Sequence, residues 1–205
     1  MTMSKPILFC DFHGVISYNF YWKSLQNPQH YLHIYHQAII VNCLDTNNNI
    51  LQSWMIGDLT TEQVHVILHQ KTGVPYQDLM DIFVDECRNI DIFEAFLAKI
   101  RSVKDKYFTI LATGNMDSFD RFTLPYNSIL QNTFDRIDNS YNIGILKTSN
   151  NGEYFVNTIQ EFAVDTKSCV LIDDSQETCK TFDNLGGKSY LITSRESAME
   201  VFDQL

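Results

Sequence analysis

The chain has 205 residues, of which 44% are hydrophobic, so it is long enough to form one well-cored domain with an inserted lobe. It contains 15 basic and 25 acidic residues, and its formal net charge is -10. This acidic balance disfavours a general attraction to nucleic acid or anionic lipid, and we expect neither nucleic acid nor a membrane as a partner. An anionic substrate must therefore be held by a local arrangement of residues.

The amino-terminal stretch "MTMSKPILFCDF" has no apolar run long enough for a signal peptide, and the run around "AIIVNCL" is too short to cross a bilayer. We therefore expect a cytoplasmic protein. The cysteines are odd in number, scattered and free of CxxC pairs, which predicts buried, reduced thiols rather than disulfides or a zinc knuckle. They are Cys10, Cys43, Cys87, Cys169 and Cys179.

The first expected element is a strand, "ILFC" at residues 7–10. Residues 28–44 then have a helical pattern. A second helix is predicted for "LTTEQVHVILHQKTGV", which has a threonine cap signal, a stripe of Val64, Ile67 and Leu68, and a glycine near its end. A third is predicted for "PYQDLMDIFVDECRNI", which opens with a proline.

The second half of the chain alternates strands and helices. Strands are expected at "YFTILAT" (107–113), "SCVLID" (168–173) and "KSYLIT" (188–193), with a weaker one at "FDRIDNS" (134–140). Helices are expected at "GEYFVNTIQEFAV" and at "SQETCKTFDNLGG", which opens with a serine cap and closes with glycines. The first of these helices places one set of side chains on a buried face: Phe155, Ile159, Phe162 and Ala163.

This alternation predicts a doubly wound, parallel α/β sheet, in which ligands bind at the carboxyl ends of the strands. The residues at those ends are polar: Asp11, Thr113, Asp173 and Asp174, with Lys147 in the loop after the weaker strand. Any one of them alone is typical of an ordinary polar loop. Together they favour a site for a divalent metal and a phosphoryl group.

Four segments in this order resemble the motifs of the haloacid dehalogenase superfamily. "DFHGV" resembles the first motif, normally Asp-x-Asp-Gly, and "ILATGN" the second. "SYNIGILK" resembles the segment that carries the lysine of the third, and "VLIDDSQET" the acidic fourth. The resemblance implies a Rossmann-like catalytic core, residues 1–15 and 91–205, and a helical cap, residues 16–90, with hinges near 15–19 and 88–92.

The resemblance also implies roles for the strand-end residues. Asp11 is the expected nucleophile and Lys147 neutralises charge on the transferring phosphoryl group. Thr113 and the amides of Gly114 and Asn115 are expected to donate hydrogen bonds to its oxygens. The expected cofactor is Mg²⁺, and its implied ligands are the carboxylates of Asp11 and Asp174 and the backbone carbonyl of His13, with Asp173 acting mostly through metal-bound water.

His13 departs from the family pattern, in which a second aspartate acts as general acid and base. An imidazole can perform both roles, because its ordinary pKa of about 6.5 suits proton transfer near neutrality. A nearby Mg²⁺ ion and Lys147 would lower this pKa and a bound phosphate would raise it, so the sequence leaves the direction open. His13 is either a working acid–base group or a mark of impaired turnover.

The expected activity is that of a Mg²⁺-dependent phosphohydrolase acting on a small phosphorylated metabolite. One alternative is a metal-free dehalogenase, which has no need of the acidic pair at 173–174. A second is a phosphate-binding or regulatory protein, suggested by His13 alone. A phosphonate-cleaving enzyme would need a lysine in the cap, where Lys23 and Lys71 are the candidates.

Two groups of side chains in the expected cap admit other interpretations. Several histidines have helical spacing, but no carboxylate or cysteine accompanies them, so a solvated or substrate-facing surface is favoured over a zinc site. They are His30, His33, His36, His65 and His69. The aromatic residues just after the first motif are interpreted as cap core rather than as a specificity pocket. They are Tyr18, Phe20, Tyr21 and Trp22.

Overall fold

The computed structural model describes residues 5–43 and 49–205. Its central feature is a five-stranded sheet in the order β3-β2-β1-β4-β5, in which all neighbouring strands are parallel. The strands are β1 (Ile7–Cys10), β2 (Phe108–Thr113), β3 (Arg136–Asn139), β4 (Val170–Asp173) and β5 (Lys188–Leu191). The predicted parallel α/β sheet is confirmed, including the weaker strand.

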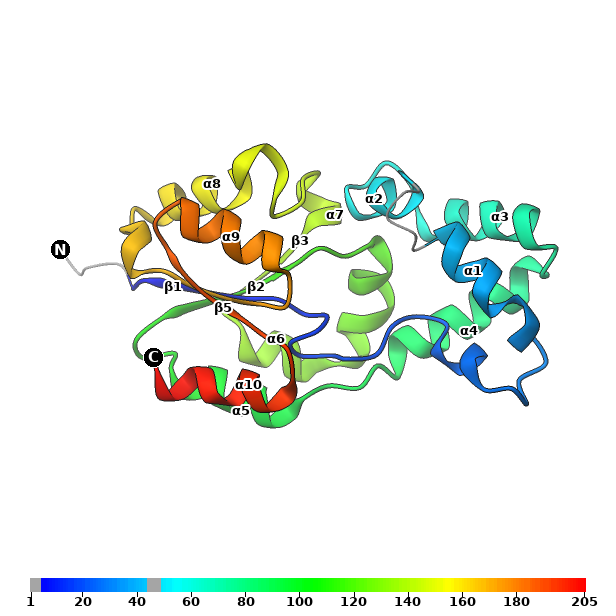
Figure 1. Ribbon diagram of the computed structural model, residues 1–205, viewed down its shortest axis with the longest axis horizontal. Coiled ribbons are helices and arrows are strands. Elements are labelled where there is room, and N and C mark those ends of the chain that lie inside the picture. Colours follow the sequence, from blue (N-terminus) through cyan, green and yellow to red (C-terminus); the bar gives the residue numbers. More distant parts are fainter. Residues whose placement is uncertain (1–4, 44–48) are drawn as a thin grey trace.

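Helices cover both faces of this sheet. In Figure 1, α8 and α9 lie on one face, and α5, α6 and α10 on the other. This arrangement explains why β1 and β4 are buried along their whole length and are apolar except for Asp173 at the end of β4, whereas the edge strand β5 is partly exposed. The helices of the core are α5 (Glu94–Ser102), α6 (Ser128–Thr133), α7 (Ser140–Ile143), α8 (Glu153–Phe162), α9 (Gln176–Asn184) and α10 (Arg195–Glu200).

A helical lobe lies beyond one end of the sheet (Figure 1). Its aromatic core is separate from the clusters around the sheet, and the rings of Trp22 and Trp54 lie 5.1 and 5.5 Å from that of Phe83. Met116, which follows β2, also belongs to this core. The lobe contains α1 (His36–Cys43), α2 (Asn49–Met55), α3 (Thr61–Thr72) and α4 (Tyr76–Arg88). That residues 16–90 act as a cap stays a prediction.

Two connections join the lobe to the sheet domain. The Phe93 N–H donates to the Ile16 carbonyl at 2.8 Å, so the connections are hydrogen-bonded to each other. Val15, Ile16 and Ile90 pack into the hydrophobic cluster around the sheet. Both expected hinge segments therefore pack against the sheet domain, while their movement stays a prediction.

The helix ends follow the expected capping signals. Thr60 and Gln63 form a capping box at the start of α3, and Gly73 ends that helix in the left-handed conformation. Ser175 caps α9 by accepting a hydrogen bond from the Thr178 N–H. These local signals can be recognised in sequence because the donor and acceptor lie only a few residues apart.

The helix expected over residues 28–44 is shorter than predicted. A 3₁₀ turn at His33–Tyr35 leads into α1, and Leu44 lies outside the described residues. The Asn27 side chain accepts a hydrogen bond from the Gln29 N–H at 3.0 Å. Such side-chain-to-backbone bonds compete with helix formation.

Ala163 is the second difference from the sequence prediction. It was expected on the buried face of α8, but it follows the helix with a φ of 51° and is exposed. The helix ends at Phe162, so the helical spacing no longer applies.

The five cysteines are free and buried, as expected. Of the helices in the described part of the chain, none has the length and apolar character needed to cross a membrane.

Candidate active site

Neighbouring parallel strands bring Asp11 and Asp173 to the same edge of the sheet. Cys10 of β1 pairs with Ile172 of β4, and the Asp11 N–H donates to the Ile172 carbonyl at 2.9 Å. Both carboxylates are buried. The strand order thus places two acids that are far apart in the sequence at the crevice where α/β sheets bind ligands.

Lys147 reaches both carboxylates from the loop after α7. Gly144 ends this short helix with a φ of 80°, a conformation that favours glycine. The Lys147 Nζ lies 2.9 Å from Asp11 Oδ1 and 2.5 Å from Asp173 Oδ2. One ammonium group therefore bridges two buried carboxylates.

Burial and charge have opposing effects on the pKa values of Asp11, Asp173 and Lys147. Burial raises the pKa of Asp173 to about 6; Lys147 opposes the shift and Asp11 adds to it. Burial also raises the pKa of Asp11 against the effect of Lys147. For Lys147, burial acts to lower the pKa, but Asp11 and Asp173 raise it overall. Burial is thus the main cause of the raised pKa of the two carboxyls, and the two acids are the cause of the raised pKa of the ammonium.

A third carboxylate completes a group that can hold a metal ion. One oxygen from each of Asp11, Asp173 and Asp174 lies within 4.8 Å of the others, and this is the one such group of three among the described residues. Gly14 makes the approach of Asp174 possible, because a Cβ at Gly14 would lie 2.1 Å from Asp174 Oδ2. An all-oxygen donor set with excess negative charge fits Mg²⁺. The expected ligation by the carbonyl of His13 stays a prediction.

The loop after β2 contributes the expected phosphoryl-binding residues. Thr113 is buried at the end of β2, and Gly114 lines the cleft with no atom within 4 Å of where its Cβ would lie. The Asn115 N–H, however, donates to Ser140 Oγ at 3.0 Å. Its expected bond to a phosphoryl oxygen therefore requires this contact to break, and the binding roles of the three residues stay predictions.

His13 lies in an aromatic enclosure beside Asp11. The rings of Phe12 and Tyr21 meet the imidazole edge-on at 5.0 and 5.5 Å, and the Phe20 ring stacks on it at 5.8 Å. Burial lowers the pKa of His13 to about 4, and Lys147 adds to this shift. The imidazole is therefore neutral near pH 7 in the protein alone: its lone pair is free to accept a proton, but it is a weaker base than an ordinary histidine.

The site opens into a cleft of about 260 Å³. Asp11, Gly114, Lys147 and Asp173 line it, together with neighbours of Lys147 and residues at the start of α9. Met55, at the end of α2, lines it from the helical lobe. The cleft therefore lies between the sheet edge and the lobe.

Three histidines of the lobe contact nearby backbone carbonyls. Their Nδ1 atoms each lie 2.7 or 2.8 Å from a backbone carbonyl oxygen. These are His33, His65 and His69. Within the ranges that the structure describes, neither they nor His30 and His36 belong to a group of metal ligands.

The early aromatic residues divide between two environments. Tyr21 and Trp22 pack in the lobe core, as expected. Phe20 is 61% exposed and, with Lys23, lines a separate groove of about 430 Å³ next to the connections. Tyr18 is half-buried.

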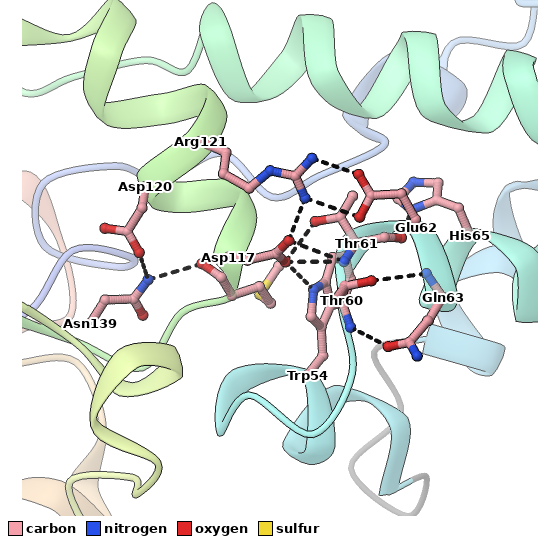
Figure 2. A network of polar contacts seen from close by, with 11 residues as sticks. Trp54, Thr60, Thr61, Glu62, Gln63, His65, Asp117, Asp120, Arg121 and Asn139 are labelled. Carbon is pink, nitrogen blue, oxygen red and sulfur yellow. Dashed lines mark hydrogen bonds and ion pairs between the residues drawn. The ribbon is translucent and has the colours of Figure 1, made fainter.

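Sequence reasoning missed the contacts that join the lobe to the loop after β2. Figure 2 shows Asp117 of this loop facing Trp54 and Thr61 of the lobe, with Arg121 alongside. The four-residue spacing of Asp117 and Arg121 is the one signal that could have suggested part of this network. The remaining contacts join residues more than 50 positions apart, for which no local pattern exists.

Comparison with known proteins agrees with this architecture. A scan of protein-family models and a search of curated proteins find no match. Solved structures do match: a predicted HAD-like family hydrolase from Porphyromonas gingivalis has a TM-score of 0.75 and 18% identity, covering 98% of this chain and 97% of its own. The chain has the haloacid dehalogenase (HAD) fold.

Other structures with the HAD fold contain different ligands. A HAD family enzyme from Bacteroides thetaiotaomicron, in complex with magnesium and inorganic phosphate, has a TM-score of 0.72 and 19% identity over 91% of this chain and 93% of that one. An L-2-haloacid dehalogenase from Xanthobacter autotrophicus, with chloropropionic acid covalently bound, has a TM-score of 0.61 and 10% identity over 94% and 80%. These similarities establish the fold, and the chemistry must be argued from this chain's own residues.

Proposed function

We propose that the protein is a Mg²⁺-dependent phosphohydrolase that acts on a small phosphomonoester through an aspartyl-phosphate intermediate. The observation that carries this proposal is the group formed by Lys147 and three carboxylates, of which two are buried. Three carboxylates against one ammonium leave an excess of negative charge that a divalent cation would offset. A metal-free dehalogenase would have no use for this excess.

In the first step, a carboxylate oxygen of Asp11 attacks phosphorus, and the bond from phosphorus to the ester oxygen breaks. The Lys147 ammonium, already 2.9 Å from Asp11, stabilises the negative charge of the transferring group. Mg²⁺ held by Asp11, Asp173 and Asp174 would offset the repulsion between the attacking carboxylate and the phosphoryl oxygens. The alcohol leaves with a proton.

In the second step, water attacks phosphorus of the aspartyl phosphate, which releases phosphate and restores Asp11. The neutral imidazole of His13 can accept the proton of this water. For the first step it must carry a proton to the alcohol, and a bound phosphoryl dianion favours the protonated form. Over both steps, one water is consumed and one alcohol and one phosphate are formed.

The test is a screen of phosphorylated metabolites with Mg²⁺, repeated with the Asp11→Asn variant and with a chelator. We expect phosphate release that both treatments abolish. The matched control is Asp203→Asn, which removes an exposed acid near the end of the chain and should retain activity. Activity that survives in Asp11→Asn would contradict the proposal, and haloacid turnover that survives chelation would favour the dehalogenase alternative.

A further inference from the structure

A buried carboxylate of the sheet domain holds two helices of the lobe. The Asp117 Oδ1 accepts hydrogen bonds from Trp54 Nε1 at 2.8 Å and from Thr61 Oγ1 at 2.7 Å, and the Thr61 N–H donates to Asp117 at 3.1 Å (Figure 2). Trp54 belongs to α2, and Thr61 is the first residue of α3. Asp117 therefore joins the loop after β2 to both helices at once.

An outer layer of charge surrounds this contact. The Arg121 guanidinium lies 2.6 Å from Asp117 Oδ2 and 2.5 Å from Glu62 Oε1. Arg121 and Glu62 are each more than 40% exposed at their side chains, whereas Asp117 is buried. The inner hydrogen bonds are thus shielded from water and the outer ion pair is not.

A second contact holds the residue next to Trp54. The Ser140 Oγ lies 2.7 Å from the Met55 carbonyl oxygen and donates to it. The same hydroxyl oxygen accepts the Asn115 N–H at 3.0 Å. The backbone of Met55 is therefore connected through one hydroxyl to the loop that carries Thr113 and Gly114.

Met55 is also the residue by which the lobe reaches the cleft. Among the described residues that line the cleft, it alone comes from the lobe, and the others belong to the sheet domain. Asp11 and Lys147 line the same cleft. A group attached to a phosphoryl on Asp11 therefore shares this limited space with Met55.

We propose that Met55 determines which leaving groups the cleft accepts, and that Asp117 and Ser140 are positioning residues that hold it there. This inference rests on the proposed function, because it takes the phosphoryl group to bind at Asp11. Trp54 and Met55 are adjacent, and the sheet domain binds one through its indole and the other through its carbonyl. The wall that Met55 forms therefore packs against the lobe core and is also held by Asp117 and Ser140 of the sheet domain.

Phosphonates of different size test the role of Met55 without any need for turnover. Affinities for methylphosphonate and benzylphosphonate are measured by calorimetry with Mg²⁺. We expect Met55→Ala to improve the affinity for benzylphosphonate relative to methylphosphonate by about tenfold, because the removed side chain vacates space. Met55→Leu conserves the volume and should change the ratio by less than about threefold.

Two tryptophans provide a matched test of the positioning role. Trp54→Phe removes the N–H that Asp117 accepts but keeps an aromatic ring. Trp22→Phe makes the same change in the same aromatic core, where the Trp22 Nε1 has no hydrogen-bond partner among the described residues. We expect Trp54→Phe to speed hydrogen exchange of the Thr61 amide about tenfold and to shift the phosphonate ratio as Met55→Ala does, and Trp22→Phe to do neither.

The outcomes separate the inference from the proposed function. If the phosphonates bind but their affinity ratio is the same in Met55→Ala as in the wild type, Met55 does not select leaving groups and the proposed function stands. If the Thr61 amide exchanges its hydrogen at the same rate in Trp54→Phe and Trp22→Phe, the positioning role of Asp117 is wrong. If no phosphonate binds to the wild type, both the inference and the phosphoryl site fail.

Discussion

Two buried acidic sites lie at the two ends of residues 113–117, and they differ in how the charge of their carboxylates is satisfied. At the sheet edge, Asp11 and Asp173 share one ammonium, and burial raises the pKa of both carboxyls. At the junction with the lobe, Asp117 accepts hydrogen bonds from two side chains and a backbone amide and pairs with Arg121. The carboxylates at the sheet edge outnumber their one cation, whereas the carboxylate of Asp117 has several hydrogen-bond donors and a cation of its own.

The difference indicates different uses. An unbalanced group of carboxylates is costly to bury unless a cation or a substrate completes it, so it is suited to binding and chemistry. A satisfied carboxylate stabilises one arrangement of the elements around it. The segment at residues 113–117 thus connects the proposed active site to the contact between Asp117 and the lobe.

Removing the expected nucleophile should have the largest effect. Asp11→Asn keeps the size of the side chain but loses the attacking oxygen charge, and we expect phosphatase activity to fall by on the order of 10⁴ or more. Steady-state phosphate release measures it, with circular dichroism as the check on folding. A loss smaller than about tenfold would mean that Asp11 does not attack phosphorus.

The next effect concerns proton transfer by His13. His13→Ala should slow hydrolysis of an alkyl phosphate by on the order of 10² to 10⁴, and that of an activated aryl phosphate much less, since an aryl alcohol needs little protonation to leave. The ratio of the two rates is the measurement. Equal losses for both esters would remove His13 from the role of acid. His13→Asp is the contrast, because a faster enzyme would show that the imidazole is a poor substitute for the family's aspartate.

The contact between Asp117 and the lobe should contribute to the stability of the fold. Asp117→Ala leaves the donors of Trp54 and Thr61 buried without their acceptor, and we expect the free energy of unfolding to fall by about 2 to 4 kcal/mol. Urea unfolding measures this change. Asp203→Asn, which removes an exposed acid, should cost less than about 0.5 kcal/mol. Equal stability of the two variants would contradict the structural role of Asp117.

The smallest effect is expected at the outer ion pair. The hydrogen bond from Arg121 lowers the pKa of Glu62 to about 2 from an ordinary 4.5, against an opposing effect of burial. A carboxyl with a lowered pKa stabilises the fold above its ordinary pKa and loses this contribution as the pH falls through about 2. Because both side chains are more than 40% exposed, solvent screening limits the contribution to less than about 1 kcal/mol.

Glu62→Gln tests this sign. The free energies of unfolding of wild type and variant should differ above pH 4.5 and converge as the pH falls towards 2. A difference that grows on acidification would contradict the ion pair as its source.

The parts that sequence predicted well are those fixed by local pattern. Runs such as "ILFC" and "VLID" identify buried parallel strands, and the strand ends place Asp11 and Asp173 at one crevice because parallel strands end together. Helix caps at Thr60 and Ser175 could be recognised for the same local reason.

The parts that could not be predicted depend on distant contacts. Nothing in the sequence around Asp117 indicates that an indole 63 positions away donates to it. The direction of the pKa shift of His13 likewise required its burial among aromatic rings, which only the folded chain reveals. The prediction that Ala163 is buried was wrong for a local reason. Its spacing fits the buried face of α8, but the helix ends one residue earlier.

The most direct test of the central claim is a crystal structure with Mg²⁺ and beryllofluoride, an analogue of the phosphoryl group on an aspartate. We expect the beryllium to be bonded to a carboxylate oxygen of Asp11, with Lys147 and Thr113 in contact with the fluorides and Mg²⁺ held by Asp11, Asp173 and Asp174. An analogue bound elsewhere, or separated from Asp11 by solvent, would contradict the assignment of Asp11 as the nucleophile of this site.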